Sequence, residues 1–378
     1  MKKLIFRFII IIISSVFLLI TYLSIIGIET DKFNNQIREK IKKIDKNLEI
    51  DIKKIKLVFD PFNFEISAKT LGTRLSLQNS IIELESVKSL ISLKSIINNE
   101  FSISNIDIST KSVEIKKIIS FVRGITKNTK LLILQNFIKE GFLIADIKLE
   151  FDQKGNIKDN YDLKGFIKDT KINFLKKHKF EKVNFIFYHN QKETNLEKIQ
   201  LSYNRLDLFF EKILIKNDKT DFLINGVLKN KNLSLNNEII KQLFISDNYE
   251  VREANLDSRN IFSFKIDKKF RLKDLVINSK AKINKLVITN NYELKEIFPD
   301  AKSEINFNNH NIEINYDKKI FDINGSGNVL LQNSNDKLDY IIRKDKGGIK
   351  FDTLIEIKKN PLSINFFNFK KDTNDEAK

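Results

Sequence analysis

The stretch Ile55-Lys-Leu-Val-Phe-Asp-Pro-Phe-Asn-Phe-Glu-Ile66 places apolar side chains at nearly every second position on each side of a central proline. In an extended chain, side chains with this period point to one face of a sheet. Pro61 has no N–H to donate and interrupts the run. The stretch therefore predicts two strands separated at Pro61, each with one apolar and one solvated face.

The same alternation continues over most of the chain, from residue 50 to about residue 370. Clusters of Asn, Asp, Lys and Ser separate the runs and are typical of turns. We therefore expect a mainly β fold with a long antiparallel sheet and a few short helices. The clearest further runs are Val183, Phe185 and Phe187; Leu206, Leu208 and Phe210; Phe262, Phe264 and Ile266; Ile312, Ile314 and Tyr316; and Leu362, Ile364 and Phe366.

Three short segments break the β pattern. Helical spacing of apolar residues predicts a helix over 114–123 and another over 236–244, where Phe244 is the last apolar member. A third helical turn is expected at 294–298, and Pro299 would stop it.

Three of the expected strands share a glycine two residues after an aliphatic residue. The strings are Leu163-Lys-Gly165, Ile224-Asn-Gly226 and Ile323-Asn-Gly325. Their spacing is too irregular for a formal repeat. Because glycine inside a strand often marks a bend or a bulge, we expect these positions to curve the sheet.

The N-terminus carries an uncharged apolar run over residues 8–28, preceded by Lys2, Lys3 and Arg7. Twenty-one residues at about 1.5 Å per residue are enough to cross a bilayer of about 30 Å. The run is longer than the apolar part of a usual signal peptide, and residues 26–29 lack a small-residue cleavage site. We therefore expect residues 1–29 to be a retained transmembrane anchor, with a cleaved signal peptide as the alternative.

Basic residues on both sides of the run leave its orientation open to two interpretations. A count of the charges that follow the run would place the downstream part in the cytoplasm. Long domains, however, translocate largely regardless of their charge. We therefore expect a single-pass protein of the bacterial inner membrane, with its C-terminal body in the periplasm. The basic residues after the run are Lys32, Arg38, Lys40, Lys42, Lys43 and Lys46.

An amphipathic helix is expected over residues 30–48, with Thr30 as its N-cap. Its apolar residues follow one another at intervals of three and four, and charged residues occupy the other face. This helix would pack on the domain behind it or lie at the membrane surface. The apolar stripe consists of Phe33, Ile37, Ile41, Ile44 and Leu48.

Beyond the helix, the composition stays level and no linker rich in proline, glycine or serine appears. We therefore expect one periplasmic β domain over residues 49–370. The polar tail, residues 371–378, is expected to be disordered.

The formal net charge of +17 invites a nucleic acid or an anionic membrane as partner. However, Lys, Asn, Ile and Phe all have AT-rich codons, so a biased genome explains the excess of lysine. The phenylalanines fall on the apolar strand face rather than beside the lysines, which disfavours stacking on bases. We expect no nucleic acid partner.

Reactive constellations are missing from the sequence. The chain has no cysteine and only three scattered histidines, and it lacks the phosphate-binding, nucleophile-elbow and zinc-protease motifs. We therefore expect a protein that is not an enzyme and that has no cofactor, no metal site and no catalytic residue. An envelope hydrolase whose site is assembled only by the fold remains an alternative.

An ordered series of features resembles the AsmA-like family of envelope proteins. A lone N-terminal span and a helix precede a strand that runs into a proline; a strand, an "SL-x-SL" segment and a paired strand follow. The glycine-containing strands and the segment before Pro299 are similar to later parts of the family. The strings that carry the resemblance are Leu57-Val-Phe-Asp-Pro61-Phe, Ile82 to Leu84, Ser89-Leu-Ile-Ser-Leu93 and Phe101-Ser-Ile-Ser-Asn-Ile-Asp-Ile108.

The resemblance implies that the sheet over residues 49–370 is long, curved and folded into an open groove with an apolar inner face. It also implies phospholipid transport between the inner and outer membranes. Many relatives are far longer, so the chain would be a short member or an N-terminal portion. The implied partners are phospholipid acyl chains, the inner membrane and other envelope proteins. The alternative is a structural or adaptor protein with a closed β core and no lipid conduit.

The candidate groove-lining residues are the inward members of the alternating runs. A register error of one residue would exchange the two faces of a strand. The candidates are Leu57, Phe59, Phe64, Ile66, Phe185, Phe187, Leu208, Phe210, Phe264, Ile266, Ile314, Ile364 and Phe366.

Overall fold

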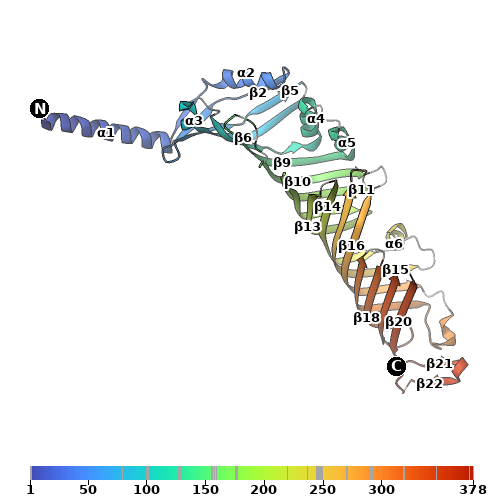
Figure 1. The fold of residues 1–378 in the computed structure, drawn as a ribbon. Coiled ribbons are helices and arrows are strands. Elements are labelled where there is room, and N and C mark those ends of the chain that lie inside the picture. Colours follow the sequence, from blue (N-terminus) through green and yellow to red (C-terminus); the bar gives the residue numbers. More distant parts are fainter. Residues whose placement is uncertain are drawn as a thin grey trace. The chain divides into compact units, whose positions relative to one another are not determined.

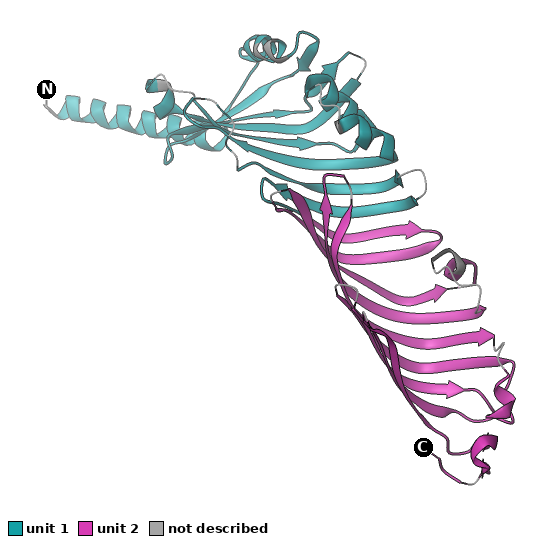
Figure 2. Ribbon diagram, turned by 45° about the vertical axis from the view of Figure 1, so that its right-hand side comes forward, with its two compact units in different colours: residues 1–194 teal, residues 195–378 magenta. Residues whose placement is uncertain are grey.

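A computed structural model describes residues 2–377, except 79, 99–101, 127–129, 155, 157, 159, 175–177, 219, 236, 244–249, 270, 290–292, 318–319, 346 and 374. The described chain is mainly β, with an N-terminal apolar helix, long antiparallel strands and a few short helices. This confirms the fold class expected from the alternation. The chain divides into two compact units, residues 1–194 and 195–378 (Figure 2), although the sequence shows no boundary there.

Unit 1 begins with the apolar helix α1 (Lys2–Ile25), which extends away from the sheet of this unit (Figure 1). Among the described residues, α1 is the one helix long and apolar enough to cross a membrane. It ends earlier than the predicted span, because Ile28 already belongs to strand β1 (Ile28–Thr30). Gly27 joins the two elements with a φ of +74°, and a Cβ there would lie 2.2 Å from the Leu57 carbonyl oxygen. Only glycine fits this junction without strain.

The sheet of unit 1 is antiparallel throughout, in the order β1-β3-β4-β6-β7-β9-β10-β11. Short strands extend it where β2 pairs with β5, β5 with β6 and β8 with β9. The two strands predicted around Pro61 are β3 and β4. The bounds are β2 (Leu48–Asp51), β3 (Ile55–Asp60), β4 (Glu65–Leu71), β5 (Arg74–Leu77), β6 (Ser80–Ser92), β7 (Ile103–Thr110), β8 (Val113–Glu114), β9 (Ile138–Glu150), β10 (Asp162–Phe174) and β11 (His178–Asn190).

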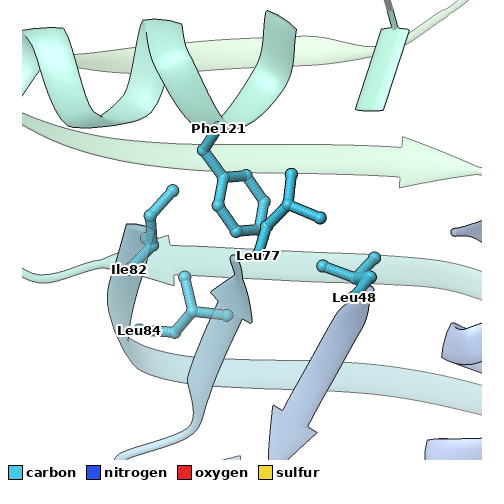
Figure 3. Packing of buried hydrophobic residues seen from close by; sticks show 5 residues of the cluster. All are labelled: Leu48, Leu77, Ile82, Leu84 and Phe121. Carbon is cyan, nitrogen blue, oxygen red and sulfur yellow. The ribbon is translucent and has the colours of Figure 1, made fainter. Parts of the chain in front are cut away.

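Four further helices belong to unit 1: α2 (Asn34–Ile44), α3 (Leu93–Ile97), α4 (Ile115–Thr126) and α5 (Lys130–Phe137). Helix α4 is the one predicted over 114–123. Figure 3 shows the ring of Phe121, from α4, among four aliphatic side chains of the strands. A second cluster joins α4 to the start of β9 through Ile115, Ile119 and Ile138. Helices α4 and α5 therefore close one end of the sheet.

The amphipathic helix is shorter than predicted. Thr30 is not its N-cap, because Thr30 ends β1 and its hydroxyl accepts a hydrogen bond from the Lys32 N–H. The N-cap is Phe33, which makes no capping side-chain bond. Leu48 leaves the helix and is buried in β2. Strand pairing of residues 48–51 with β5 outweighs the helical spacing there.

Unit 2 is an antiparallel meander in which each strand from β13 to β20 pairs with the next. Strand β12 precedes it, and the two-residue turn Asn204-Arg205 between β12 and β13 has positive φ at both positions, as a type I′ hairpin turn requires. The bounds are β12 (Glu193–Tyr203), β13 (Leu206–Asp218), β14 (Asp221–Leu235), β15 (Val251–Asp267), β16 (Leu272–Thr289), β17 (Glu304–Asp317), β18 (Ile320–Leu330), β19 (Asp336–Asp345) and β20 (Gly348–Glu356).

Two helical segments of unit 2 match the remaining helix predictions. They are α6 (Asn237–Leu243) and the 3-10 turn η1 (Leu294–Glu296). Phe244, the last apolar member of the predicted stripe, lies outside the described residues. The segment around η1 packs Leu294, Phe298 and Ala301 on one end of the sheet.

The C-terminal end is more ordered than expected for a disordered tail. Strand β21 (Leu362–Ile364) pairs with β22 (Phe369–Lys371), with the 3-10 turn η2 (Asn365–Phe367) between them. Lys371 is buried and donates hydrogen bonds to the Asn360 and Asp372 carbonyls, each over 2.8 Å. Ala377 forms an isolated bridge with Ile357. These backbone partners explain the difference from the expectation, because composition alone does not show them.

The Phe121 cluster makes a stability prediction for unit 1. Phe121→Ala should lower the free energy of unfolding by about 3 to 5 kcal/mol, since it leaves a cavity in the cluster. Phe62→Ala is the control, because this ring is 97% exposed and its loss should change stability little. Urea unfolding of both variants would measure this, and equal effects would contradict the packing described.

Candidate functional site: an apolar face on each sheet

Strand register in unit 2 places the apolar side chains on one face of the sheet. Residues directly opposite one another on neighbouring strands point to the same side. Phe264 of β15 lies opposite Ile224 of β14, and Phe262 lies opposite Ile277 of β16. We call this surface the unit 2 apolar face. Its large members are Leu208, Phe210, Ile213, Ile215, Phe222, Ile224, Leu228, Phe262, Phe264, Ile266, Ile277, Ile312, Ile314, Tyr316, Ile323, Ile342 and Phe351.

The opposite face of the same strands is mostly charged or amidic. Ion pairs link neighbouring strands there, such as Lys280–Glu313 at 2.8 Å and Lys229–Glu211 at 3.2 Å. These pairs are exposed, so each contributes little to stability. Their charged side chains keep this face hydrated.

Unit 1 shows the same division. Leu57 lies opposite Ala68, and Phe59 lies opposite Ile66. At the other side of the unit, Phe185 of β11 lies opposite Ile167 of β10. We call this surface the unit 1 apolar face. Its large members are Ile55, Leu57, Phe59, Ile66, Val87, Ile91, Ile106, Ile108, Ile147, Leu149, Leu163, Ile167, Phe185 and Phe187.

Ten of the thirteen candidate residues lie on these faces. Five belong to unit 1, namely Leu57, Phe59, Ile66, Phe185 and Phe187. Five belong to unit 2, namely Leu208, Phe210, Phe264, Ile266 and Ile314. Alternation sufficed for these residues because each lies in a run of its own strand in which every second residue is apolar.

The other three candidates lie outside the main strands. Phe64 occupies the turn before β4 with a φ of 55°, and its ring meets that of Phe59 at 6.3 Å. Ile364 belongs to the separate two-stranded sheet of β21 and β22. Phe366 lies in η2 and is 89% exposed. Alternation over three residues cannot distinguish a strand from such a turn.

The apolar faces are half-buried rather than sealed. The rings of Phe210, Phe262 and Phe264 are all of intermediate exposure. Phe222 is 42% exposed and Phe351 72% exposed. Side chains of this kind are shielded by neighbours beside them but not by a layer above them, whereas the members of a closed core are almost fully buried. Within the described residues, helices and the η1 segment cover the ends of these faces.

The three strand glycines lie beneath aromatic rings of the next strand. Gly165 lies opposite Phe187, Gly226 opposite Phe262 and Gly325 opposite Tyr340. A Cβ on Gly226 would lie 2.2 Å from the Phe262 ring, and one on Gly325 would lie 2.1 Å from the Tyr340 ring. Each ring thus lies flat along the apolar face, covering backbone that a side chain would otherwise cover.

These three glycines do not mark β-bulges, because the strand register is continuous at each of them. The register shifts lie elsewhere, and several of them coincide with polar residues of positive φ. Asp169, Asn232 and Asn309 are three of them. Asn and Asp tolerate this conformation better than most residues, and an extra residue at such a site bends and twists its strand. Sequence reasoning missed them because isolated Asn and Asp also occur on solvated strand faces.

His310 is the one fully buried titratable residue of the described part of unit 2's apolar face. It is 1% exposed, its ring stacks on Tyr340 at 5.5 Å, and both ring nitrogens lack a hydrogen-bond partner. Gly327 leaves the space that the ring occupies. Desolvation lowers the pKa of His310, and the Asp339 carboxylate opposes this in part. We therefore expect a neutral imidazole at pH 7.

The other two histidines lie in unit 1, apart from each other along β11. His189 contacts the Thr194 hydroxyl through Nδ1 at 2.8 Å. Among the described residues, no group of three or more His, Asp or Glu side chains is placed to hold a metal ion.

The ring-over-glycine contact predicts a coupled pair of substitutions. Gly226→Ala should destabilise unit 2 by about 1 to 3 kcal/mol, because the new methyl group collides with the Phe262 ring. In Phe262→Leu the same Gly226→Ala change should cost much less. A double-mutant cycle by urea unfolding measures the coupling. Additive effects would contradict the contact.

His310 predicts a pH dependence of stability. Its folded pKa is lowered, so the unfolded state binds the proton first as pH falls below about 6.5. Stability should therefore decrease on acidification, by at most about 1.4 kcal/mol per pH unit for one proton. His310→Phe should remove this component of the slope between pH 7.5 and 5.5, whereas His189→Phe should keep it. Thermal melts across this range test it, and an unchanged slope in His310→Phe would contradict the assignment.

The candidate site thus consists of two half-buried apolar faces and an N-terminal apolar helix. Comparisons with protein-family models, with curated proteins and with solved structures find no match to this chain. The chemistry of these surfaces is therefore what indicates a function.

Proposed function

We propose that the protein is anchored in the bacterial inner membrane by α1 and that the apolar faces of its sheets shelter phospholipid acyl chains for transport between membranes. The observation that carries the proposal is the half-burial of large apolar side chains along both faces. The AsmA-like resemblance of the sequence supports the same assignment.

Hydrogen bonding makes these faces suitable for acyl chains. The backbone N–H and C=O groups of the strands are paired within the plane of the sheet, so the face presents side chains only. Each sheltered CH₂ contributes roughly 0.8 kcal/mol, so the gain adds up along a chain without any directional bond. The protein needs no catalytic residue for such sheltering.

The anchoring helix supports a location at the membrane. All described side chains of the apolar run in α1 are half-buried or exposed, so the described part of the chain leaves most of the helix surface uncovered. A lipid bilayer would cover that surface. The basic residues before it fit a cytoplasmic N-terminus, with the sheets on the periplasmic side.

A closed β core, the structural alternative, is disfavoured by the same half-burial. A protein partner rather than a lipid could also cover an apolar face, and the following test separates these possibilities. It compares two substitutions on one strand.

Phe264→Asp places a carboxylate on the unit 2 apolar face, and Ile261→Asp places one on the opposite face of the same strand, where Ile261 is 42% exposed. Both variants should fold, because neither carboxylate is sealed from water. Only Phe264→Asp should lose co-purified phospholipid. Mass spectrometry measures the bound phospholipid, and a thermal melt of the same sample measures folding. The proposal fails if the parent protein carries no phospholipid, or if Phe264→Asp unfolds while Ile261→Asp does not.

The topology makes a separate prediction. A reporter enzyme active only outside the cytoplasm should be active when fused after Lys378. Sequencing of the mature N-terminus should find residues of α1 still attached. A mature protein that begins near Glu29 would show a cleaved signal sequence instead and would exclude the anchor.

A further inference from the structure

The turn between β3 and β4 presents the most exposed aromatic side chain among the described residues. Phe62 is 97% exposed at the tip of the hairpin, and Phe64 beside it is 47% exposed. Ile97 of α3, which follows β6, is 71% exposed. The Leu93 N–H at the start of α3 donates to the Phe64 carbonyl over 3.1 Å, so α3 is attached to the turn. Exposed apolar side chains that gather at one place on a surface are typical of an interaction site.

The turn is held in shape by its own polar atoms. Asp60 Oδ1 accepts hydrogen bonds from the backbone N–H groups of Phe62 and Asn63 over 3.0 and 3.2 Å, and Asp60 Oδ2 accepts one from the Asn63 amide over 2.8 Å. The pKa of Asp60 is lowered by the hydrogen bonds that it accepts from the side chain and backbone of Asn63 and from the backbone of Phe62. The carboxylate therefore stays ionised and continues to accept these bonds. The exposed position of Phe62 is thus preorganised rather than a product of a loose loop.

The strand register places this turn next to the end of α1. Strand β1 runs away from the helix, and β3 pairs with it antiparallel, with Ile28 opposite Leu57. Strand β3 therefore runs back toward the helix and past the junction at Gly27, beside Val58. At about 3.3 Å per residue, the turn extends on the order of 10 Å beyond this junction. Helix α1 packs against β3, which places the turn alongside the last turns of the helix.

We propose that Phe62, with Phe64 and Ile97, inserts into the membrane interface beside α1 and forms a second contact of the protein with the bilayer. The uncharged run of the helix continues to Ile28, so the interface lies near the junction. A tip that reaches about 10 Å back along the helix meets the headgroup and upper acyl region. Tyr22, half exposed on the last turns of α1, suits the same level.

A second contact with the bilayer would restrict how unit 1 can turn relative to the membrane. A single helix leaves unit 1 free to rotate about the helix axis, whereas a second contact beside it fixes one orientation of the sheet toward the membrane. The inference rests on α1 being in the membrane, as proposed above, but not on lipid sheltering by the apolar faces.

The absence of tryptophan from the chain allows a direct test. Phe62→Trp introduces the only tryptophan, at the tip of the turn, and excitation near the red edge of its absorption avoids the tyrosines. Phe142→Trp is the matched control: Phe142 is 44% exposed on β9, and its part of β9 is joined to the helices that close the opposite end of the unit 1 sheet. Each full-length variant is reconstituted into phosphatidylcholine vesicles, with and without brominated acyl chains, at about 0.15 M salt to screen the positive net charge.

Emission of Phe62→Trp should shift to shorter wavelength in vesicles and should lose most of its intensity when the acyl chains are brominated. Emission of Phe142→Trp should change little between the two lipids. Combining Phe62→Trp with Phe264→Asp should leave the quenching unchanged, which separates this contact from acyl chains sheltered on the apolar face. The inference is overturned if Phe62→Trp is quenched by an aqueous quencher and not by brominated lipid. It is also overturned if both positions are quenched equally, which would indicate general adsorption of the protein to the vesicle surface.

Discussion

The antiparallel hydrogen-bond ladder is the constraint on which the rest of this structure depends. Within each unit, neighbouring strands satisfy one another's backbone groups in the plane of the sheet. The faces of the sheet are then left to the side chains, and a period of two sorts them into an apolar and a charged set. An apolar face can remain half-exposed without any unpaired backbone group beneath it. This property makes the faces suited to a ligand such as an acyl chain, which offers no hydrogen bonds in return.

Cross-strand packing adjusts this simple pattern in two ways. Glycines at 165, 226 and 325 let rings of the next strand lie flat, so that the apolar surface continues over positions without a side chain. Polar residues with positive φ, such as Asn232 and Asn309, insert bulges that bend individual strands. The first device keeps the face apolar, and the second changes its curvature. The glycines and the bulges occupy different positions in the strands.

The connection between α1 and the first strands sets where the apolar helix lies against the sheet of unit 1. Gly27 permits a turn so tight that the helix ends beside β3 rather than at a distance from it. The same pairing brings the turn of Asp60 to Phe64 back toward the helix. The apolar helix and the exposed ring of Phe62 therefore lie at one end of the unit 1 strands, while the helices α4 and α5 close the other end.

Sequence alone determined the fold class, the N-terminal apolar helix and ten of the thirteen candidate face residues, because alternation and hydrophobic length are local properties. It also indicated α4, whose apolar spacing is regular. Tertiary structure alone decided that Leu48 joins a strand, that the glycines lie under rings, that His310 is buried, and that Ile364 and Phe366 leave the main strands. The first three depend on partners far along the chain, about which local spacing carries no information, whereas Ile364 and Phe366 belong to a short hairpin that three alternating residues do not distinguish from a long strand. The register between strands supplies this information, because the register determines which residues lie opposite one another.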